Sequence, residues 1–245
     1  MARRKRKEEA EGKGEDGSSS PSPSSPTFSH EEAFALLKQA ERAMTSFYEA
    51  AATDAAVAAE GLALLPGVEA LLENLAAREG VVQALVTGNL QPIGWRKVET
   101  LGVARHFDEI VLSSGEDGGG GGGGEGEKKG RVGGFGSDFC SSEEAAIDEP
   151  WRDRARFIEV AAERALRTAA AAKLACSPSP PSVARKVHVG DTPFDLKAAR
   201  AAGALPVGVA TGVFSRGELE AAGVPGAVIL DDLSDLEASL RAMGF

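Results

Sequence analysis

Five short apolar runs after residue 80 constrain the fold of this chain more than any other feature. They are VVQALV (81–86), EIVL (109–112), KVHVG (186–190), PVGVA (206–210) and AVIL (227–230), and a helical segment is expected after each of the last three. Short apolar strands that alternate with helices are typical of parallel sheets covered on both faces. The sequence therefore predicts an α/β fold with a doubly wound parallel sheet.

Further helices are expected before and between these strands. One begins near Pro66, one ends at Gly102, and a long alanine-rich helix extends from Trp151 to Lys173. The stretch GGFGSD (133–138) is rich in turn-forming residues and is predicted to be a turn. The glycine-rich segment at about 115–130 can add little to a core, so we expect a flexible loop insertion there.

The N-terminal quarter of the chain has a different character. Residues 1–28 are charged and then rich in serine and proline, which is typical of a disordered tail. Ser29 and Glu32 are spaced as a capping box at a helix start. An apolar stripe at helical spacing follows and is expected to pack against another helix; it consists of Phe34, Leu37, Ala40, Met44, Phe47 and Tyr48. We therefore expect a tail at 1–28, a helical unit at 29–60 and a core at 61–245.

Charge and composition exclude several classes of protein. No apolar run approaches 18 residues, so no membrane span is expected. The net charge is −10 and the basic residues form no stripe outside residues 3–7, which argues against nucleic-acid binding. Cys140 and Cys176, the two cysteines, have no metal-site spacing and fit a reducing compartment. These features predict a cytoplasmic protein; a nuclear location, signalled by the basic cluster, is the weaker alternative.

The tripeptide Thr87-Gly88-Asn89 comes directly after the first apolar run. Ligands bind beyond the carboxyl ends of strands in open parallel sheets, and a hydroxyl with backbone N–H groups at a helix start can hold a phosphate. An ordinary strand-to-helix turn explains the same residues. Lys97 lies about two turns into the next helix and could lean back toward this turn, or it could be a solvated surface lysine.

The segment GDTPFD (190–195) combines two carboxylates at a strand-to-helix junction. Thr192 suits the N-cap, Pro193 suits the first helical position, and Asp195 falls at the third position of a capping box. Asp195 thus has a structural explanation, whereas Asp191 precedes the cap at the mouth of the sheet. Two carboxylates four residues apart also suit Mg²⁺, which takes one or two protein carboxylates and keeps several waters.

Other polar and aromatic residues are expected to be structural. The arginines that follow Trp151 are interpreted mainly as one solvated helix face; they are Arg152, Arg154 and Arg156. His188 alternates with two valines in a strand, and Trp95 is expected to contribute to packing.

Several segments together resemble a known family. LLPGVEALLENLA, ALVTGNL, KVETLGVARHFDEIV, GGFGSD and VHVGDTPFDLKAARAAGALPVGVATG are similar to segments of the haloacid dehalogenase (HAD) superfamily, and within it to phosphoglycolate-phosphatase-like hydrolases. The resemblance covers roughly residues 62–240. It implies a Rossmann-like core with a remnant helical cap. It also implies Mg²⁺ on Asp191 and Asp195, phosphate on Thr87 and the amides that follow it, and a steadying lysine, best matched by Lys97.

The family's catalytic Asp-x-Asp motif is not found where it is expected. In the family this motif ends the first strand, and it supplies the nucleophile and the general acid–base. Residues 1–60 contain no apolar strand followed by Asp-x-Asp. The resemblance places that strand between those that bear TGN and GDTPFD. We therefore expect the first strand to be missing, through a truncated gene model or a degenerate copy.

These observations favour one functional hypothesis and leave two alternatives. The first is a Mg²⁺-dependent phosphatase-type hydrolase by descent, directed at a small phosphorylated metabolite and inactive as written. The second is a non-catalytic protein that keeps the metal and phosphate sites. A phosphoacceptor signalling domain is less favoured, because no acceptor aspartate follows an early strand. Neither the substrate nor the oligomeric state can be inferred from the sequence.

Overall fold

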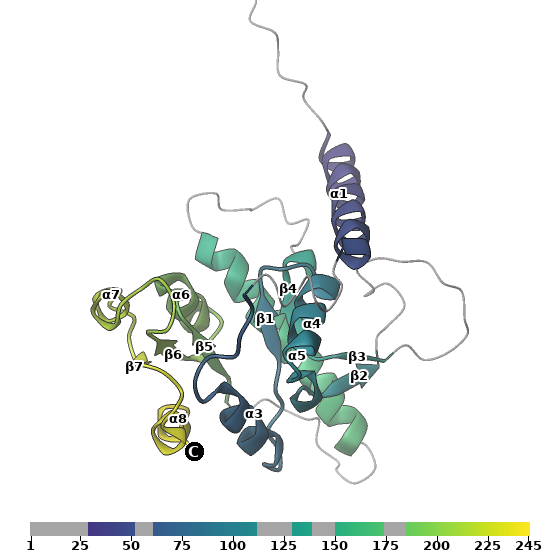
Figure 1. The fold of residues 1–245 in the computed structure, drawn as a ribbon. Helices are drawn as coiled ribbons and strands as arrows, with labels where there is room; N and C mark the ends of the chain where they lie inside the picture. Colours follow the sequence, from purple (N-terminus) through teal and green to yellow (C-terminus); the bar gives the residue numbers. More distant parts are fainter. Residues whose placement is uncertain (1–28, 52–60, 112–128, 139–149, 174–184) are drawn as a thin grey trace, which may run out of the picture.

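A computed structural model describes residues 29–51, 61–111, 129–138, 150–173 and 185–245 (Figure 1). The helices are α1 (His30–Ala51), α3 (Val68–Ala76), α4 (Gln91–Thr100), α5 (Pro150–Lys173), α6 (Pro193–Ala201), α7 (Arg216–Ala221) and α8 (Leu236–Ala242). The strands are β1 (Leu85–Thr87), β2 (Glu109–Val111), β3 (Lys129–Arg131), β4 (Gly133–Phe135), β5 (Val187–Gly190), β6 (Leu205–Val209) and β7 (Val228–Leu230).

The strands form three short sheets. β5, β6 and β7 form a parallel sheet in that order, with Val189 opposite Val207 and Val207 opposite Val228. β1 and β4 form a separate parallel pair, and β2 pairs with β3 in antiparallel fashion. This mixed α/β arrangement with short parallel sheets is consistent with a Rossmann-like HAD fold.

Helices pack on both faces of the β5–β7 sheet. On one face, Val207 and Val209 of β6 join a buried cluster with Leu71 of α3 and Met243 at the end of α8. On the other face, α5 and α6 pack through small side chains, and this second cluster includes Ala155, Ile158, Ala198, Ala199, Ala202 and Ala204. Val86 of β1 packs against the second cluster as well.

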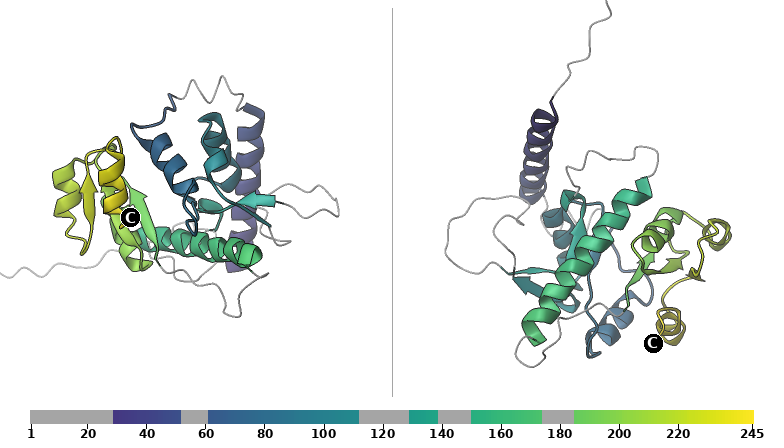
Figure 2. Two further views of the ribbon diagram at one scale, coloured as in Figure 1. Left: turned by 90° about the horizontal axis from the view of Figure 1, so that it is seen from below. Right: turned by 180° about the vertical axis from the view of Figure 1, so that it is seen from behind.

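The long helix α5 connects the two parallel sheets. It contacts β4, β1 and β2 as well as α6, and Figure 2 shows it extending across both groups of strands. β1 pairs on one side with β4, and β5 pairs on one side with β6; across the described ranges neither has a strand on its other side. The strands that end at Thr87 and Gly190 therefore belong to different sheets.

Most predicted elements form at the expected positions, because their signals are local. The Ser29–Glu32 capping box is present, with the Ser29 N–H donating to the Glu32 carboxylate at 2.9 Å and the Glu32 N–H donating to the Ser29 hydroxyl at 3.2 Å. Gly102 adopts a φ of +75° after α4, a backbone conformation that glycine reaches without strain. The long helix and the last three strands also lie where the sequence predicted them.

Three predictions about the fold are wrong or incomplete. The GGF of GGFGSD is strand β4 rather than a turn, because it pairs in parallel with β1. The EIVL run forms β2, which pairs antiparallel with β3 instead of joining the parallel sheet. The α1 stripe does not pack as expected, since Leu37, Met44 and Phe47 are exposed. The tail at 1–28, residues 52–60 of the helical unit and most of the glycine-rich insertion lie outside the described residues.

A membrane-spanning helix is not found in the described ranges. None of the helices there combines the length and the apolar character that crossing a bilayer requires.

Candidate phosphate and metal site

The TGN turn forms a compact structure at the end of β1. The Thr87 hydroxyl accepts hydrogen bonds from the Asn89 backbone N–H at 3.2 Å and from the Asn89 side-chain amide at 2.9 Å. The Gly136 N–H donates to the Asn89 carbonyl at 2.9 Å, which joins this turn to the end of β4. Gly88 and Asn89 are exposed and Thr87 is half-buried, so this turn lies at the surface.

Glycines let three chain segments approach closely beside this turn. A β-carbon at Gly136 would overlap the Gly88 carbonyl, and a β-carbon at Gly134 would overlap the Phe157 carbonyl of α5. The glycines of GGFG therefore have a structural reason: β4 is held between the TGN turn and α5, where a side chain would not fit.

The GDTPFD segment forms the predicted capping box at the start of α6. The Asp195 N–H donates to the Thr192 hydroxyl at 3.1 Å, and one Asp195 carboxylate oxygen accepts from the Thr192 N–H at 3.1 Å and its hydroxyl at 2.7 Å. The other Asp195 oxygen forms an ion pair with Arg154 of α5. Asp195 is only 9 % exposed, and both of its carboxylate oxygens are engaged.

Arg154 is a residue of this site that sequence reasoning missed. The predicted solvated helix face is present at Arg156, which pairs at the surface with Glu159 and Glu163. Arg154 instead turns toward α6. The local sequence does not distinguish Arg154 from Arg156, because the partner of Arg154 lies 41 residues away. The side chain of Arg152 lies outside the described residues.

His188 lies close to this ion pair. Burial lowers the pKa of His188, the negative charge of Asp195 raises it, and the positive charge of Arg154 lowers it. The neighbouring valines pack on the opposite face of the sheet, with α3 and α8. The strand alternation predicted for His188 is therefore present, and it directs the imidazole toward the Arg154–Asp195 pair.

Asp191 differs from Asp195 in its surroundings. Its half-buried carboxylate lies against Gly212 in the loop after β6, where a β-carbon would overlap it. Within the described part of the chain it has neither a hydrogen bond nor an ion pair. The neighbouring Thr211 hydroxyl is buried and also lacks a hydrogen-bond partner there. Asp191 therefore keeps an open carboxylate at the end of β5.

The described side chains do not form a complete Mg²⁺ site. Asp191 offers a free carboxylate, but the oxygens of Asp195 are committed to the helix cap and to Arg154. In the ranges that the structure describes, no three His, Cys, Asp or Glu residues gather as metal ligands would. One open carboxylate is a weak anchor for an ion that favours six oxygen ligands.

Lys97 lies in the last turn of α4. The helix begins at Gln91, so Lys97 is about 9 Å along the axis from the helix start that follows the TGN turn. Helical side chains lean toward the N-terminus, which is the direction of the turn. Its role toward a phosphate stays a prediction. Trp95, two residues earlier, packs edge-on against Phe107 and Phe135, as expected for a core residue.

Both predicted motifs lie beside α5, and the strands that precede them belong to different sheets. Val86, directly before Thr87, packs against the small-residue cluster of α5 and α6. Arg154 of α5 contacts Asp195 in the first turn of α6. The TGN turn and the GDTPFD turn therefore flank the same helix, although their strands are not paired with one another.

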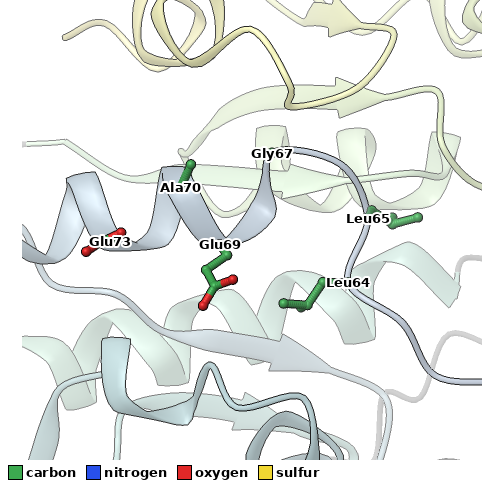
Figure 3. A pocket seen from close by; sticks show the side chains of 6 residues that line it. All are labelled: Leu64, Leu65, Gly67, Glu69, Ala70 and Glu73. Carbon is green, nitrogen blue, oxygen red and sulfur yellow. The ribbon is translucent and has the colours of Figure 1, made fainter.

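A surface pocket lies apart from both motifs. It is lined by Leu64, Leu65, Gly67, Glu69, Ala70 and Glu73, on α3 and the segment before it (Figure 3). Glu69 forms an ion pair with Arg105 at 2.7 Å. No residue proposed for phosphate or metal binding lines this pocket, so it does not mark the predicted site.

The capping role of Asp195 predicts a stability effect. Asp195→Asn should lower the free energy of unfolding by about 1 kcal/mol, the usual magnitude for a helix cap. Asp191→Asn is the matched control, because Asp191 lies outside the cap and should have little effect. Urea denaturation of both variants measures the difference. Equal losses in the two variants would contradict the role of Asp195 in the capping box.

Comparison with known proteins supports one part of the resemblance. Residues 160–236 match a family model described as HAD-hydrolase-like. The matched segment includes Asp191 and Asp195 but neither Thr87 nor Lys97. No curated protein matches the chain. The segment from the second half of α5 to the start of α8 is thus similar to HAD-like hydrolases, which supports the HAD superfamily for this protein.

Proposed function

We propose that this protein is a phosphatase-type HAD-like hydrolase by descent, which binds a small phosphorylated metabolite in the cytoplasm and needs a separate Asp-x-Asp strand for hydrolysis. One observation carries the proposal: the turns after β1 and β5 flank α5, and the second turn lies within the HAD-like segment. Phosphoglycolate-phosphatase-like substrates follow from the resemblance of residues 62–240.

The TGN turn is the proposed phosphate-binding element. The Thr87 hydroxyl and the amides of Gly88 and Asn89 precede the N-terminus of α4, where the helix dipole favours an anion. Lys97 would add positive charge from the last turn of the same helix. These groups would bind the phosphoryl oxygens, which carry the charge in the transition state of phosphoryl transfer.

Asp191 is the proposed contact for Mg²⁺. Its carboxylate is open, whereas Asp195 would act through the helix cap that positions the turn. A further ligand would have to come from a segment with Asp-x-Asp. We therefore expect weak Mg²⁺ affinity for the chain alone.

The position of the proposed Asp-x-Asp strand is between β1 and β5. Each of these strands has one edge without a strand partner in the described part of the chain. A parallel strand at these edges would pair with both sheets and bring its carboxyl end to the TGN and GDTPFD turns. The sheet would then be continuous and doubly wound, as the sequence predicted.

A second candidate function is a non-catalytic phosphate-binding protein. The observation that favours it is the engagement of both Asp195 oxygens, which leaves one open carboxylate at the site. A protein of this kind would bind phosphate but would not hydrolyse a phosphate ester when an Asp-x-Asp strand is supplied. Adding such a strand and measuring hydrolysis therefore separates the two candidates.

Phosphate binding tests the part that both candidates share. Inorganic phosphate should bind the chain, and Thr87→Val should weaken its affinity about tenfold or more, because a hydrogen bond to a charged group is lost. Thr100→Val is the matched control; its hydroxyl donates to the Arg96 carbonyl at the other end of α4. Isothermal titration calorimetry measures both. Equal affinities in the two variants would overturn the assignment of Thr87.

Magnesium titration tests the assignment of Asp191. The wild-type chain should show a weak shift in melting temperature with Mg²⁺, and Asp191→Asn should abolish it. Glu237→Gln on α8 removes one exposed carboxylate elsewhere and should leave the response intact. Identical responses in wild type and Asp191→Asn would mean that Asp191 is not a ligand.

A further inference from the structure

Helix α1 leaves most of its apolar stripe exposed to solvent. Met44 and Phe47 are 57 % and 76 % exposed, and Leu37 is 42 % exposed. Glu41 and Thr45, which lie beside this stripe on the helix surface, are buried at 7 % and 6 % exposure. An amphipathic helix normally buries its apolar stripe, so the face that should stabilise α1 is left uncovered.

The contact of α1 with the rest of the protein is loosely packed. α1 contacts α4, and a pocket between them is lined by Glu49, Pro92, Trp95, Arg96 and Glu99. The Thr45 hydroxyl and the Trp95 indole N–H are buried and have no hydrogen-bond partner among the described residues. Figure 1 shows most of α1 projecting away from the sheets. α4 therefore gives little of the burial that a 22-residue helix needs.

The exposed face has the spacing of a coiled coil. Leu37, Ala40, Met44, Phe47 and Ala51 are separated by three, four, three and four residues, which is the a and d pattern of heptads. All five are exposed, and the charged residues of α1 lie outside this seam. The helix is about 33 Å long, enough for about three heptads.

We propose that α1 forms an antiparallel helix pair with α1 of a second copy of this chain. In this orientation Ala40 lies opposite Met44 of the other copy, and Leu37 lies opposite Phe47. Each layer of the seam then contains either one small and one large residue, or two residues of similar size, as close packing requires. A parallel pair would place Ala40 on Ala40 and Met44 on Met44, which leaves gaps beside crowded layers.

The absence of charge at the seam is consistent with self-association. Like charges opposite one another would separate two copies of the same helix, but Leu36, Ala43 and Ala50 flank the seam on its open side. Lys38 and Glu41 pair with each other at 2.8 Å on the side that faces the protein. Two copies can thus meet without burying an unpaired charge, and the four large exposed apolar side chains of α1 are covered.

The mass of the full chain in solution tests this pairing. Light scattering at micromolar concentration should give twice the chain mass of 25.2 kDa, and the dimer should dissociate on dilution. Met44→Glu with Phe47→Glu should give a monomer with unchanged circular dichroism of the core. Gln39→Glu with Ser46→Glu introduces the same charge at exposed positions outside the seam and should stay dimeric. A wild-type monomer, or a dimer that survives the Met44→Glu and Phe47→Glu changes, would overturn the proposal.

Cross-linking tests the orientation. In a background with Cys140→Ser and Cys176→Ser, Leu37→Cys and Phe47→Cys chains that differ in an affinity tag are mixed under oxidising conditions. An antiparallel pair should give mainly the mixed disulfide between the two variants, because Leu37 faces Phe47. If each variant instead formed a disulfide only with another copy of itself, and the mixture gave no mixed disulfide, the antiparallel arrangement would be overturned.

Discussion

Arg164→Ala is expected to lower the free energy of unfolding by about 3–5 kcal/mol, since it leaves an uncompensated carboxylate in the protein interior. Arg164 is 5 % exposed and donates to both carboxylate oxygens of Asp138, at 2.8 and 2.9 Å, and to the Gly133 carbonyl at 2.8 Å. Asp138 also accepts from the Phe135 N–H at 2.8 Å. This network joins α5 to both ends of β4.

A matched arginine on the same helix provides the control. Arg156 is exposed and pairs at the surface with Glu159, so Arg156→Ala should change stability by less than about 1 kcal/mol. Guanidinium denaturation of both variants gives the comparison. If Arg164→Ala were no more destabilising than Arg156→Ala, the buried ion pair would not hold α5 on β4. Asp138→Asn should be destabilising as well, because Arg164 would then lack its partner.

Supplying an apolar strand that ends in Asp-x-Asp should turn on hydrolysis of a generic aryl phosphate. The strand can be fused to the N-terminus or added as a peptide, and it would pair with the free edges of β1 and β5. The first aspartate would then attack the phosphorus and displace the aryl alcohol, whose oxygen takes a proton from the second aspartate. Water would hydrolyse the resulting aspartyl phosphate to inorganic phosphate and free aspartate. Hydrolysis by the chain alone should be undetectable, so the expected effect is all or none.

An Asn-x-Asn version of the strand separates binding from chemistry. It should pair with the same edges and give no activity. Hydrogen exchange measures the pairing: in the chain alone, amides of β1 and β5 should exchange faster than those of β6, which has a strand on both sides. Either strand should slow exchange in β1 and β5. Equal protection of β5 and β6 without any added strand would show that the edge is already covered.

The two outcomes of this experiment distinguish the two candidate functions. Slowed exchange with aryl phosphate hydrolysis supports the phosphatase-type hydrolase. Slowed exchange without hydrolysis supports a phosphate-binding protein. The solubility of the chain should also improve in either case, because open strand edges favour pairing between molecules.

The sequence by itself determined the elements whose signals are local. The capping boxes at Ser29 and Thr192 depend on residues three positions apart, and both are present in the structure. The strands β5, β6 and β7 follow from apolar runs that end at glycines or turns, and α5 follows from a long helical segment. Spacing from the N-cap Thr192 also predicted that Asp195 completes the capping box and that Asp191 lies outside it.

Tertiary structure alone decided the features that depend on neighbours distant in sequence. The two glycines of GGF disfavour a strand, and GGF becomes β4 because it pairs in parallel with β1. Helix α5 lies so close that only glycine fits at Gly134. The same applies to the ion pairs of Arg154 and Arg164, whose partners lie 41 and 26 residues away. Periodicity identified the apolar stripe of α1, but periodicity shows that a helix has an apolar face and not what covers it. Pairing and packing arise from long-range contacts, which a local pattern does not encode.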